Sequence, residues 1–302
     1  MSSVNKYLSL VKFSHTIFAM PFAIIGFFLG IASLYLSSVP DWHTIIYPPS
    51  LISKLTKLFV LVVLCMIFAR SAAMAFNRYL DSSFDARNPR TAIREIPAGI
   101  ISRESALWFV IISCLLFILT TFFINPICFY LSPVALFVIL FYSYTKRFTA
   151  LCHLVLGVGL SLAPIGAYLS VTGRFDILPV LFSIIVLFWV SGFDIIYALQ
   201  DETFDKTHNL HSIPASIGKA KALNVSKFFH FISAVFVVVA GFYGSFGWLY
   251  WVGTLIFAGM LVYQHSIISP GDLSKVNISF MTANGIASVV FSIFVLFDIF
   301  IN

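Results

Sequence analysis

Charged side chains are scarce in this chain. Only 10% of its 302 residues are Asp, Glu, Lys or Arg, whereas a soluble domain carries about 25%. Hydrophobic residues make up 60% of the sequence. A soluble fold of this size could not bury so much apolar surface, so the lipid bilayer must be part of the solvent. The composition also fits neither a disordered chain nor a coiled coil.

Motifs of several soluble functions are missing as well. No Walker A loop, GxGxxG fingerprint or GxSxG elbow occurs, which argues against ATP-driven transport, nicotinamide chemistry and α/β-hydrolase catalysis. The four cysteines form no CxxC pair, and no HExxH or HxxxH pairing indicates zinc. The net charge of +6 is explained by the excess of Lys and Arg that cytoplasmic loops of membrane proteins carry, so nucleic-acid binding is not expected.

Nine apolar runs are long enough to cross a bilayer. The first follows Lys6 and Lys12 and is too long for the apolar core of a signal peptide; its Gly26 and Gly30 favour close helix packing. The predicted spans cover residues 16–36, 57–78, 105–124, 127–145, 153–171, 177–199, 224–244, 247–268 and 277–299. We therefore predict an all-α, polytopic membrane protein with nine transmembrane helices, and we expect residues 1–302 to form one domain.

The basic residues predict the orientation of these spans. If the N-terminus is cytoplasmic, fifteen of the eighteen Lys and Arg residues lie on the cytoplasmic side. Only Lys54, Lys57 and Arg174 lie on the other side, as the positive-inside rule requires. We therefore expect a multi-pass protein of the inner (cytoplasmic) membrane. Its N-terminus and its two long polar loops, at about 79–104 and 200–222, would be cytoplasmic.

Half of the twelve acidic residues fall in the short segments 77–85 and 194–205. Residues four apart on a helix lie about 40° apart, and steps of seven and four also return to nearly one face. Each segment therefore predicts a polar stripe at a cytoplasmic helix end. The stripes are Asn77, Asp81 and Asp85, and Asp194, Asp201 and Asp205. One such cluster could be an ordinary charged helix end, but two on the same predicted face indicate a functional site.

The two stripes predict bound metal. Stacked carboxylates repel one another unless a cation lies between them. Carboxylate and amide oxygens suit Mg²⁺, which prefers to share its site with phosphate oxygens. Two facing aspartate clusters are therefore expected to bind magnesium and a pyrophosphate ester.

Basic and aromatic residues extend the predicted site. Arg70 lies seven residues before Asn77 and shares its helix face, and an Arg inside an apolar span rarely lacks a partner. Lys146 and Arg147 close the fourth span beside Tyr142. This basic pair is either a clamp for pyrophosphate or a substrate carboxylate, or an anchor that sets the topology.

Other charged residues near the clusters have less specific interpretations. Glu202 lies about 100° off the second stripe, so we expect an ordinary solvated loop acid. Arg87, Arg90 and Arg94 follow the first cluster, and some of them serve topology alone. His211 follows the second cluster, where a contact with substrate and a structural role in the loop are equally open.

Taken together, these motifs resemble the signatures of the UbiA-type intramembrane aromatic prenyltransferases. The first signature is matched by Asn77-x3-Asp81-x3-Asp85 and then Asn88-Pro89-Arg90-Thr91-x2-Arg94-x-Ile96-Pro97-x-Gly99. The second is matched by Asp194-x2-Tyr197-Ala198-x2-Asp201-x3-Asp205. Further matches are Arg70-Ser71 and Tyr142-x3-Lys146-Arg147. The likeness runs from about Lys12 to the ninth span.

One position departs from the common pattern. Many members of the family begin the first motif with Asn-Asp, whereas this chain has Asn77-Arg78. A subgroup with Asn-Arg there, and with the sequence of Leu210–Pro214 after the second motif, is similar. That subgroup has been labelled 4-hydroxybenzoate polyprenyltransferase, and part of it is associated with a naphthoate acceptor of the futalosine route to menaquinone. The departure leaves the acceptor open, but not the reaction class.

The resemblance implies a bundle of nine helices around a central cavity in which Mg²⁺ bridges both motifs to polyprenyl pyrophosphate. An allylic cation forms, and a ring carbon next to a phenolic hydroxyl attacks it. The implied catalytic and metal-binding residues are Asn77, Asp81, Asp85, Asp194, Asp201 and Asp205. The implied substrate-binding residues are Asn77, Arg70, Lys146 and Arg147, which hold pyrophosphate or acceptor, and Tyr142 and Tyr197, which orient the substrate.

The sequence therefore predicts a magnesium-dependent prenyltransferase of ubiquinone or menaquinone biosynthesis. Its expected acceptor is an aromatic acid of the 4-hydroxybenzoate type, with 1,4-dihydroxy-6-naphthoate as the alternative. An ion-coupled secondary transporter is the non-enzyme alternative, but it would place its acids near the bilayer midplane rather than at helix ends. A CDP-alcohol phosphotransferase would carry a DG-x2-AR motif, which is absent.

Overall fold

The computed structural model describes residues 3–11, 19–36 and 48–301, and these are almost entirely helical. The long helices are α2 (Met20–Ile31), α3 (Pro49–Asp85), α4 (Arg103–Phe122), α5 (Pro126–Thr145), α6 (Cys152–Thr172), α7 (Ile177–Ala198), α10 (Lys219–Tyr243), α11 (Trp248–Ser266) and α12 (Asn284–Ile301). The short elements are α1 (Ser3–Leu10), α8 (Glu202–Thr207), α9 (Ile213–Ile217) and the turns η2 (Ala32–Leu36), η4 (Leu199–Asp201) and η5 (Ile278–Ala283). Within the described residues, β-type pairing is limited to the isolated bridge between Ser269 and Asp272.

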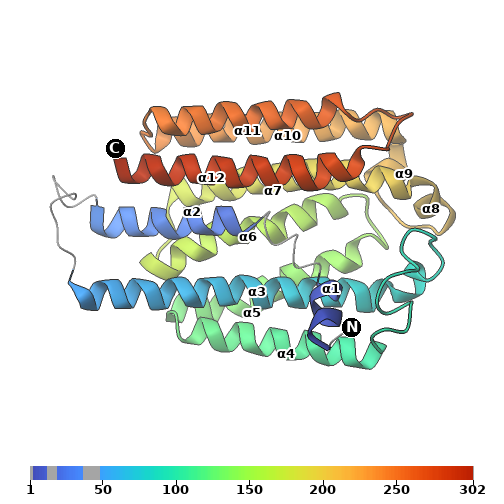
Figure 1. The fold of residues 1–302 in the computed structure, drawn as a ribbon, viewed down its shortest axis with the longest axis horizontal. Coiled ribbons are helices and arrows are strands. Elements are labelled where there is room, and N and C mark those ends of the chain that lie inside the picture. Colours follow the sequence, from blue (N-terminus) through green and yellow to red (C-terminus); the bar gives the residue numbers. More distant parts are fainter. Residues whose placement is uncertain (1–2, 12–18, 37–47, 302) are drawn as a thin grey trace.

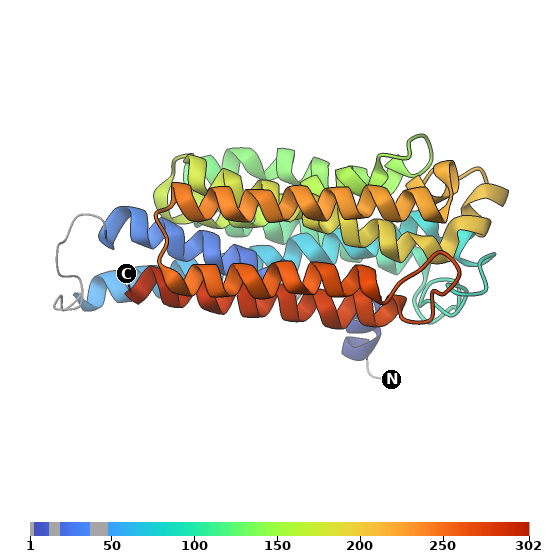
Figure 2. The ribbon, with the colours of Figure 1, turned by 90° about the horizontal axis from the view of Figure 1, so that it is seen from above.

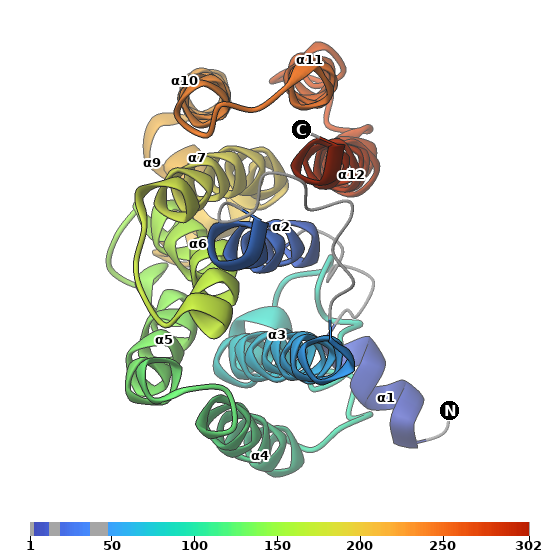
Figure 3. The same ribbon diagram turned by 90° about the vertical axis from the view of Figure 1, so that its left-hand side faces the viewer.

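The long helices run side by side along one axis (Figures 1 and 2), and α8, α9 and the segment 86–102 lie together at one end. Seen end-on, α7 lies between α6 and α10, on which it packs, while α3 and α4 form the opposite side of the bundle (Figure 3). The short helix α1 lies outside the bundle against α3. Both predicted aspartate clusters belong to the end that carries α8, because α3 and α7 both finish there.

The all-helical membrane fold is confirmed, but the number of spans is not settled at nine. Every predicted range lies on helix to within two residues at its ends, apart from residues 16–18, which lie outside the described part of the chain together with Lys12. Among the described helices, seven are long and apolar enough to cross a membrane. Of the other two, Met20–Leu34 is shorter, and α11 is not among the seven.

Two predicted boundaries are wrong. Helix α3 has 37 residues and continues to Asp85, so the predicted loop 79–104 shrinks to 86–102. The predicted loop 200–222 contains helices α8 and α9. The predicted span ends at Arg78 because polar and charged side chains follow the apolar run there. The helix continues because protein, rather than lipid, surrounds its polar face.

The close approach of α2 and α6 depends on glycine, as the Gly26–Gly30 spacing predicted. A Cβ atom on Gly26 would lie 2.0 Å from the backbone oxygen of Pro164, and one on Gly30 would lie 2.9 Å from Cβ of Val171. Backbone atoms cannot rotate out of the way, so the two helices would have to separate.

We therefore expect Gly26→Ala to destabilise the protein by about 1–3 kcal/mol, seen as a lower thermal unfolding midpoint in detergent. The matched control is Gly259→Ala on α11, where nothing lies within 4 Å of the added atom. Alanine favours the helical backbone over glycine, so this control should unfold at or slightly above the wild-type temperature. Equal midpoints for the two variants would contradict the packing assigned to Gly26.

Candidate active site

A single cavity of about 1050 Å³ contains every residue that the sequence predicted for the site. Its polar wall comes from the ends of α3, α5 and α7, whereas side chains from the middle of α5 and α6, such as Leu131, Val138 and Leu160, make an apolar wall. The eleven predicted residues on the wall are Arg70, Asn77, Asp81, Asp85, Tyr142, Lys146, Arg147, Asp194, Tyr197, Asp201 and Asp205. The cavity is therefore charged at one end and apolar elsewhere.

The first aspartate cluster occupies the last turns of α3, where its stripe is continuous as predicted. Asn77 Nδ2 donates a hydrogen bond to Asp81 Oδ2 at 3.1 Å, one helical turn further on. Arg147 Nη2 donates to Asp81 Oδ1 at 2.9 Å, and Arg94 Nη1 donates to Asp85 Oδ1 at 2.6 Å. The second oxygen of Asp85 is buried without a hydrogen-bond partner. The cluster thus offers unused oxygen to the cavity.

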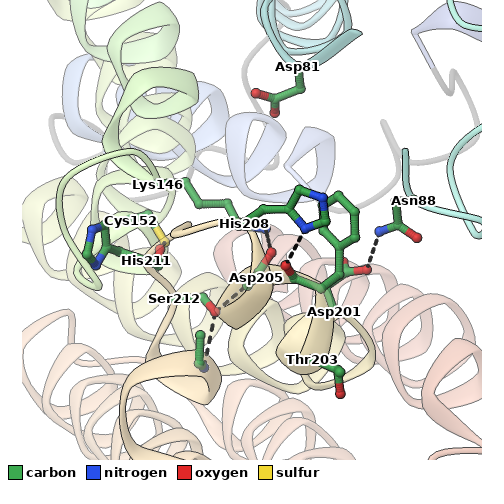
Figure 4. Close-up of polar contacts among 12 residues, drawn as sticks. Asp81, Asn88, Lys146, Cys152, Asp201, Thr203, Asp205, His208, His211 and Ser212 are labelled. Atoms are coloured by element: carbon green, nitrogen blue, oxygen red, sulfur yellow. Dashed lines mark hydrogen bonds and ion pairs between the residues drawn. The ribbon is translucent and has the colours of Figure 1, made fainter. Parts of the chain in front are cut away.

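The second cluster is not one continuous stripe, which corrects the prediction. Helix α7 ends at Ala198, the turn η4 follows, and α8 begins at Glu202. Because this turn is a tighter 3₁₀ segment, α-helical spacing from Asp194 does not carry through to Asp201. The carboxylates nevertheless line the same cavity. Figure 4 shows Asp81 projecting from α3 toward the side on which Asp201 and Asp205 lie.

Asp205 is completely buried and is held from two sides. Lys146 Nζ lies 2.7 Å from its Oδ1, and Ser212 Oγ donates to its Oδ2 at 2.8 Å (Figure 4). Burial alone would lower the pKa of Lys146, but the Asp205 carboxylate outweighs burial and raises that pKa above its usual value. Lys146 therefore stays charged at the polar end of the cavity.

Arg90 forms a fork around Asp201. Its Nε donates to Asp201 Oδ1 at 3.0 Å, its Nη2 donates to Oδ2 at 2.5 Å, and its Nη1 donates to the Tyr197 hydroxyl at 3.0 Å. Asn88 Nδ2 also donates to Asp201 Oδ1, at 3.1 Å (Figure 4). Partial burial acts to lower the pKa of Arg90, but the hydrogen bonds and the charge of Asp201 outweigh burial and raise that pKa. The segment 86–102 is thereby attached to the second cluster.

Sequence reasoning missed several of these partners. Arg90 and Arg94 were interpreted in part as topogenic, although both pair with site aspartates. His153 Nδ1 lies 2.7 Å from Asp194 Oδ2, yet the two residues are 41 positions apart on different helices. No periodicity or motif in one sequence connects such a pair. The motif spacing around Arg90 was the only signal that could have identified these partners.

Two residues with open interpretations lie outside the cavity wall. Glu202 begins helix α8, its side chain is only 15% exposed, and it pairs with Lys206 at 2.6 Å and with Lys219 at 3.8 Å, so the solvated loop acid that we expected is wrong. His211 donates its backbone N–H to the Lys146 carbonyl at 2.7 Å, and its own carbonyl faces Cys152 Sγ. His211 therefore has a structural role at the end of α5 (Figure 4).

The donor chemistry of the cavity fits a hard divalent cation. Six carboxylates and four side-chain amides line it, and these are the oxygen ligands that Mg²⁺ takes. Within the described part of the chain, no three His, Cys, Asp or Glu side chains converge on one point. Each aspartate is paired with a basic residue instead, as Asp201 is with Arg90. Holding a cation therefore requires the basic side chains to move to another acceptor.

Comparisons with known proteins agree with this site. A 4-hydroxybenzoate octaprenyltransferase of Francisella tularensis subsp. mediasiatica is 25% identical over 78% of this chain and 83% of its own length. The apo structure of a UbiA homolog from Aeropyrum pernix K1 has a TM-score of 0.75 at 25% identity, covering 95% of this chain and 97% of that one. A UbiA homolog from Archaeoglobus fulgidus, solved bound to DMAPP and Mg²⁺, has a TM-score of 0.73 at 20% identity, covering 98% and 100%.

The family itself follows from the sequence profile. Residues 19–286 match that of the UbiA prenyltransferase family, a range that includes both aspartate motifs and all eleven predicted residues of the cavity wall. The resemblance seen in the motifs is confirmed, and this chain belongs to the UbiA prenyltransferase family.

Proposed function

We propose that this enzyme transfers a polyprenyl group from polyprenyl pyrophosphate to an aromatic hydroxy acid of the 4-hydroxybenzoate type, with Mg²⁺ as cofactor. The observation that carries the proposal is the cavity itself. Two aspartate clusters and four basic side chains gather at one end of it, and apolar side chains line the remainder. A pyrophosphate ester with a long hydrocarbon tail has the same division of polarity. The name of the Francisella relative supports the acceptor class.

The roles follow from the position of each side chain. Asn77, Asp81, Asp85, Asp194, Asp201 and Asp205 would hold the magnesium. Bound there, Mg²⁺ would neutralise charge on the leaving pyrophosphate. Arg90, Arg94, Lys146 and Arg147 would donate hydrogen bonds to pyrophosphate oxygens, because each already presents its donors to an anionic oxygen.

The apolar part of the cavity would hold the prenyl chain and exclude water from the cation. Phe193 and Tyr197 line it, and an aromatic face stabilises a nearby positive charge. Tyr197 is already held by Arg90 and packs on Phe280, with ring centroids 4.4 Å apart. Tyr142, near the end of α5, and Arg70, deeper on α3, also line the cavity. Both are placed to orient the acceptor ring.

The membrane placement is part of the proposal. We infer that the polar end of the cavity faces the cytoplasm across the inner membrane, because fifteen of the eighteen basic residues then lie on that side. The aspartates lie at helix ends rather than in the middle of the spans, which favours an enzyme over an ion-coupled transporter. That residues 1–302 form a single domain stays a prediction.

A dihydroxynaphthoate is the second candidate acceptor, and Arg78 is the observation that favours it. Arg78 stands where many family members have aspartate, and it lines the cavity. A changed charge on the wall of the cavity is expected to change the acceptor rather than the prenyl donor, whose pyrophosphate lies with the aspartates.

We expect the purified protein to form a prenylated aromatic acid when given Mg²⁺, a polyprenyl pyrophosphate and equal amounts of 4-hydroxybenzoate and 1,4-dihydroxy-6-naphthoate. Mass spectrometry of the products identifies the acceptor and the prenyl chain length together. EDTA should stop product formation, and added Mg²⁺ should restore it. Failure to prenylate either acid at any chain length would refute the assignment, as would uptake of a solute without prenylated product.

A further inference from the structure

Arg78 lines the cavity without an acidic partner in the described part of the chain, whereas four other basic residues of the wall each pair with an aspartate. Its side chain is only 6% exposed, and its Nε is buried without a hydrogen-bond partner. Among the described residues, none of the ion pairs includes it, whereas Arg90, Arg94, Lys146 and Arg147 each pair with an aspartate. A buried, unpaired charge costs several kcal/mol. An anionic ligand bound in the cavity beside Arg78 would offset this free-energy cost.

The two acids that influence Arg78 each bond another residue through one oxygen, and the second oxygen of each is buried without a hydrogen-bond partner among the described residues. Asp85 and Glu95 both act on Arg78 electrostatically. Asp85 is bonded by Arg94, and Glu95 Oε1 accepts a hydrogen bond from the Ser9 hydroxyl. Ser9 belongs to α1, which the buried Leu10 fixes against α3 and α4. Glu95 thus bonds the short N-terminal helix and forms no ion pair with Arg78, which lines the cavity.

Arg78 lies on α3 at the inner edge of the first aspartate cluster, directly after Asn77. Arg78 lies seven residues before Asp85, which is about 10 Å along the helix axis. Helical side chains tilt toward the N-terminus of their helix, which for α3 is the direction away from the aspartates and into the bundle. The guanidinium therefore lies between the polar end and the apolar interior. A ring that attacks the first carbon of the prenyl chain has to lie in this region.

We propose that Arg78 binds the carboxylate of the aromatic acceptor and so selects acids over neutral phenols. The planar guanidinium matches a carboxylate with two parallel hydrogen bonds, a fit that neither an amide nor an ester reproduces. This inference rests on the proposed prenyl transfer to an aromatic acid. Arg78 would thus decide which aromatic acceptor is bound, whereas the basic residues paired with aspartates would bind the pyrophosphate.

The test compares Arg78→Gln and Arg78→Lys with wild type on two acceptors of nearly equal shape, 4-hydroxybenzoate and 4-hydroxybenzamide. Arg78→Gln is expected to raise KM for the acid about 10- to 100-fold and to abolish the preference for acid over amide. KM for the prenyl pyrophosphate should change less than about threefold, and Arg78→Lys should fall between. Arg87→Gln is the matched control, because Arg87 is exposed and lies off the cavity wall.

A binding measurement separates this inference from the proposed function and does not depend on turnover. Calorimetric titration of acid and amide, with Mg²⁺ and an unreactive thio analogue of the prenyl pyrophosphate bound, should show acid selectivity in wild type and in Arg87→Gln but not in Arg78→Gln. If Arg78→Gln does not fold, Arg78→Lys serves, with a smaller loss expected. Unchanged selectivity in the variants, or a rise in KM for the prenyl pyrophosphate alone, overturns the role of Arg78. Wild type that binds the acid selectively but forms no product contradicts the proposed function instead.

Discussion

Replacing Asp201 with alanine is expected to reduce prenyl transfer by about 10³-fold or more, a loss of the size that follows removal of a charge-stabilising group from an active site. The Asp201 carboxylate accepts hydrogen bonds from Arg90 and Asn88 and lines the cavity. Its removal takes away a proposed magnesium ligand and also leaves Arg90 without the anion that positions it. The loss should appear mainly in kcat, because charge develops on the leaving group only as the bond breaks.

Two further variants make the result interpretable. Asp201→Asn keeps the shape and a hydrogen-bond acceptor but removes the charge, so it should lose nearly as much activity as Asp201→Ala. Asp272→Ala makes the same chemical change at an exposed loop position away from the cavity, and it should leave the rate unchanged. Thermal unfolding midpoints close to that of wild type would exclude misfolding. Near-normal activity of Asp201→Asn would show that the carboxylate charge plays no part in catalysis.

The fold was largely predictable because the two strongest signals are local. Apolar runs of spanning length set the helices, and every predicted span lies on helix to within two residues at its ends where the chain is described. Spacing of four residues placed Asn77, Asp81 and Asp85 on one face of α3, where Asn77 does bond Asp81. Both signals are carried within one continuous segment of the chain, so a single sequence contains them in full.

The remainder depends on contacts between distant segments. The break of α7 at Leu199 could not be predicted, because no proline or glycine marks it. The partners of the aspartates come from other elements, as His153 does for Asp194 and Arg90 does for Asp201. Hydropathy also misplaced the end of α3, since it treats every charged residue as facing water. In this structure Arg78 and Asp85 are buried by protein.

The ion pairs of the site predict that Mg²⁺ and pyrophosphate bind cooperatively. Asp81, Asp85 and Asp205 each have a basic partner, as does Asp201. A metal that binds alone must break these pairs and leave cations unpaired, and pyrophosphate alone meets the carboxylates it repels. Bound together, the metal takes the carboxylates and the pyrophosphate takes the basic side chains, so neither set is left without a partner.

We therefore expect pyrophosphate to raise the affinity for Mg²⁺ by about 5- to 150-fold, the range of typical coupling energies, and Mg²⁺ to raise the affinity for pyrophosphate equally. Calorimetric titration in both orders measures the coupling after the magnesium–pyrophosphate association in solution is subtracted. Arg90→Gln is the informative variant. It frees Asp201 beforehand, so Mg²⁺ alone should bind more tightly, pyrophosphate more weakly, and the coupling should shrink. Independent binding in wild type, or weaker binding of Mg²⁺ to Arg90→Gln, would mean that the ion pairs do not exchange partners when the site fills.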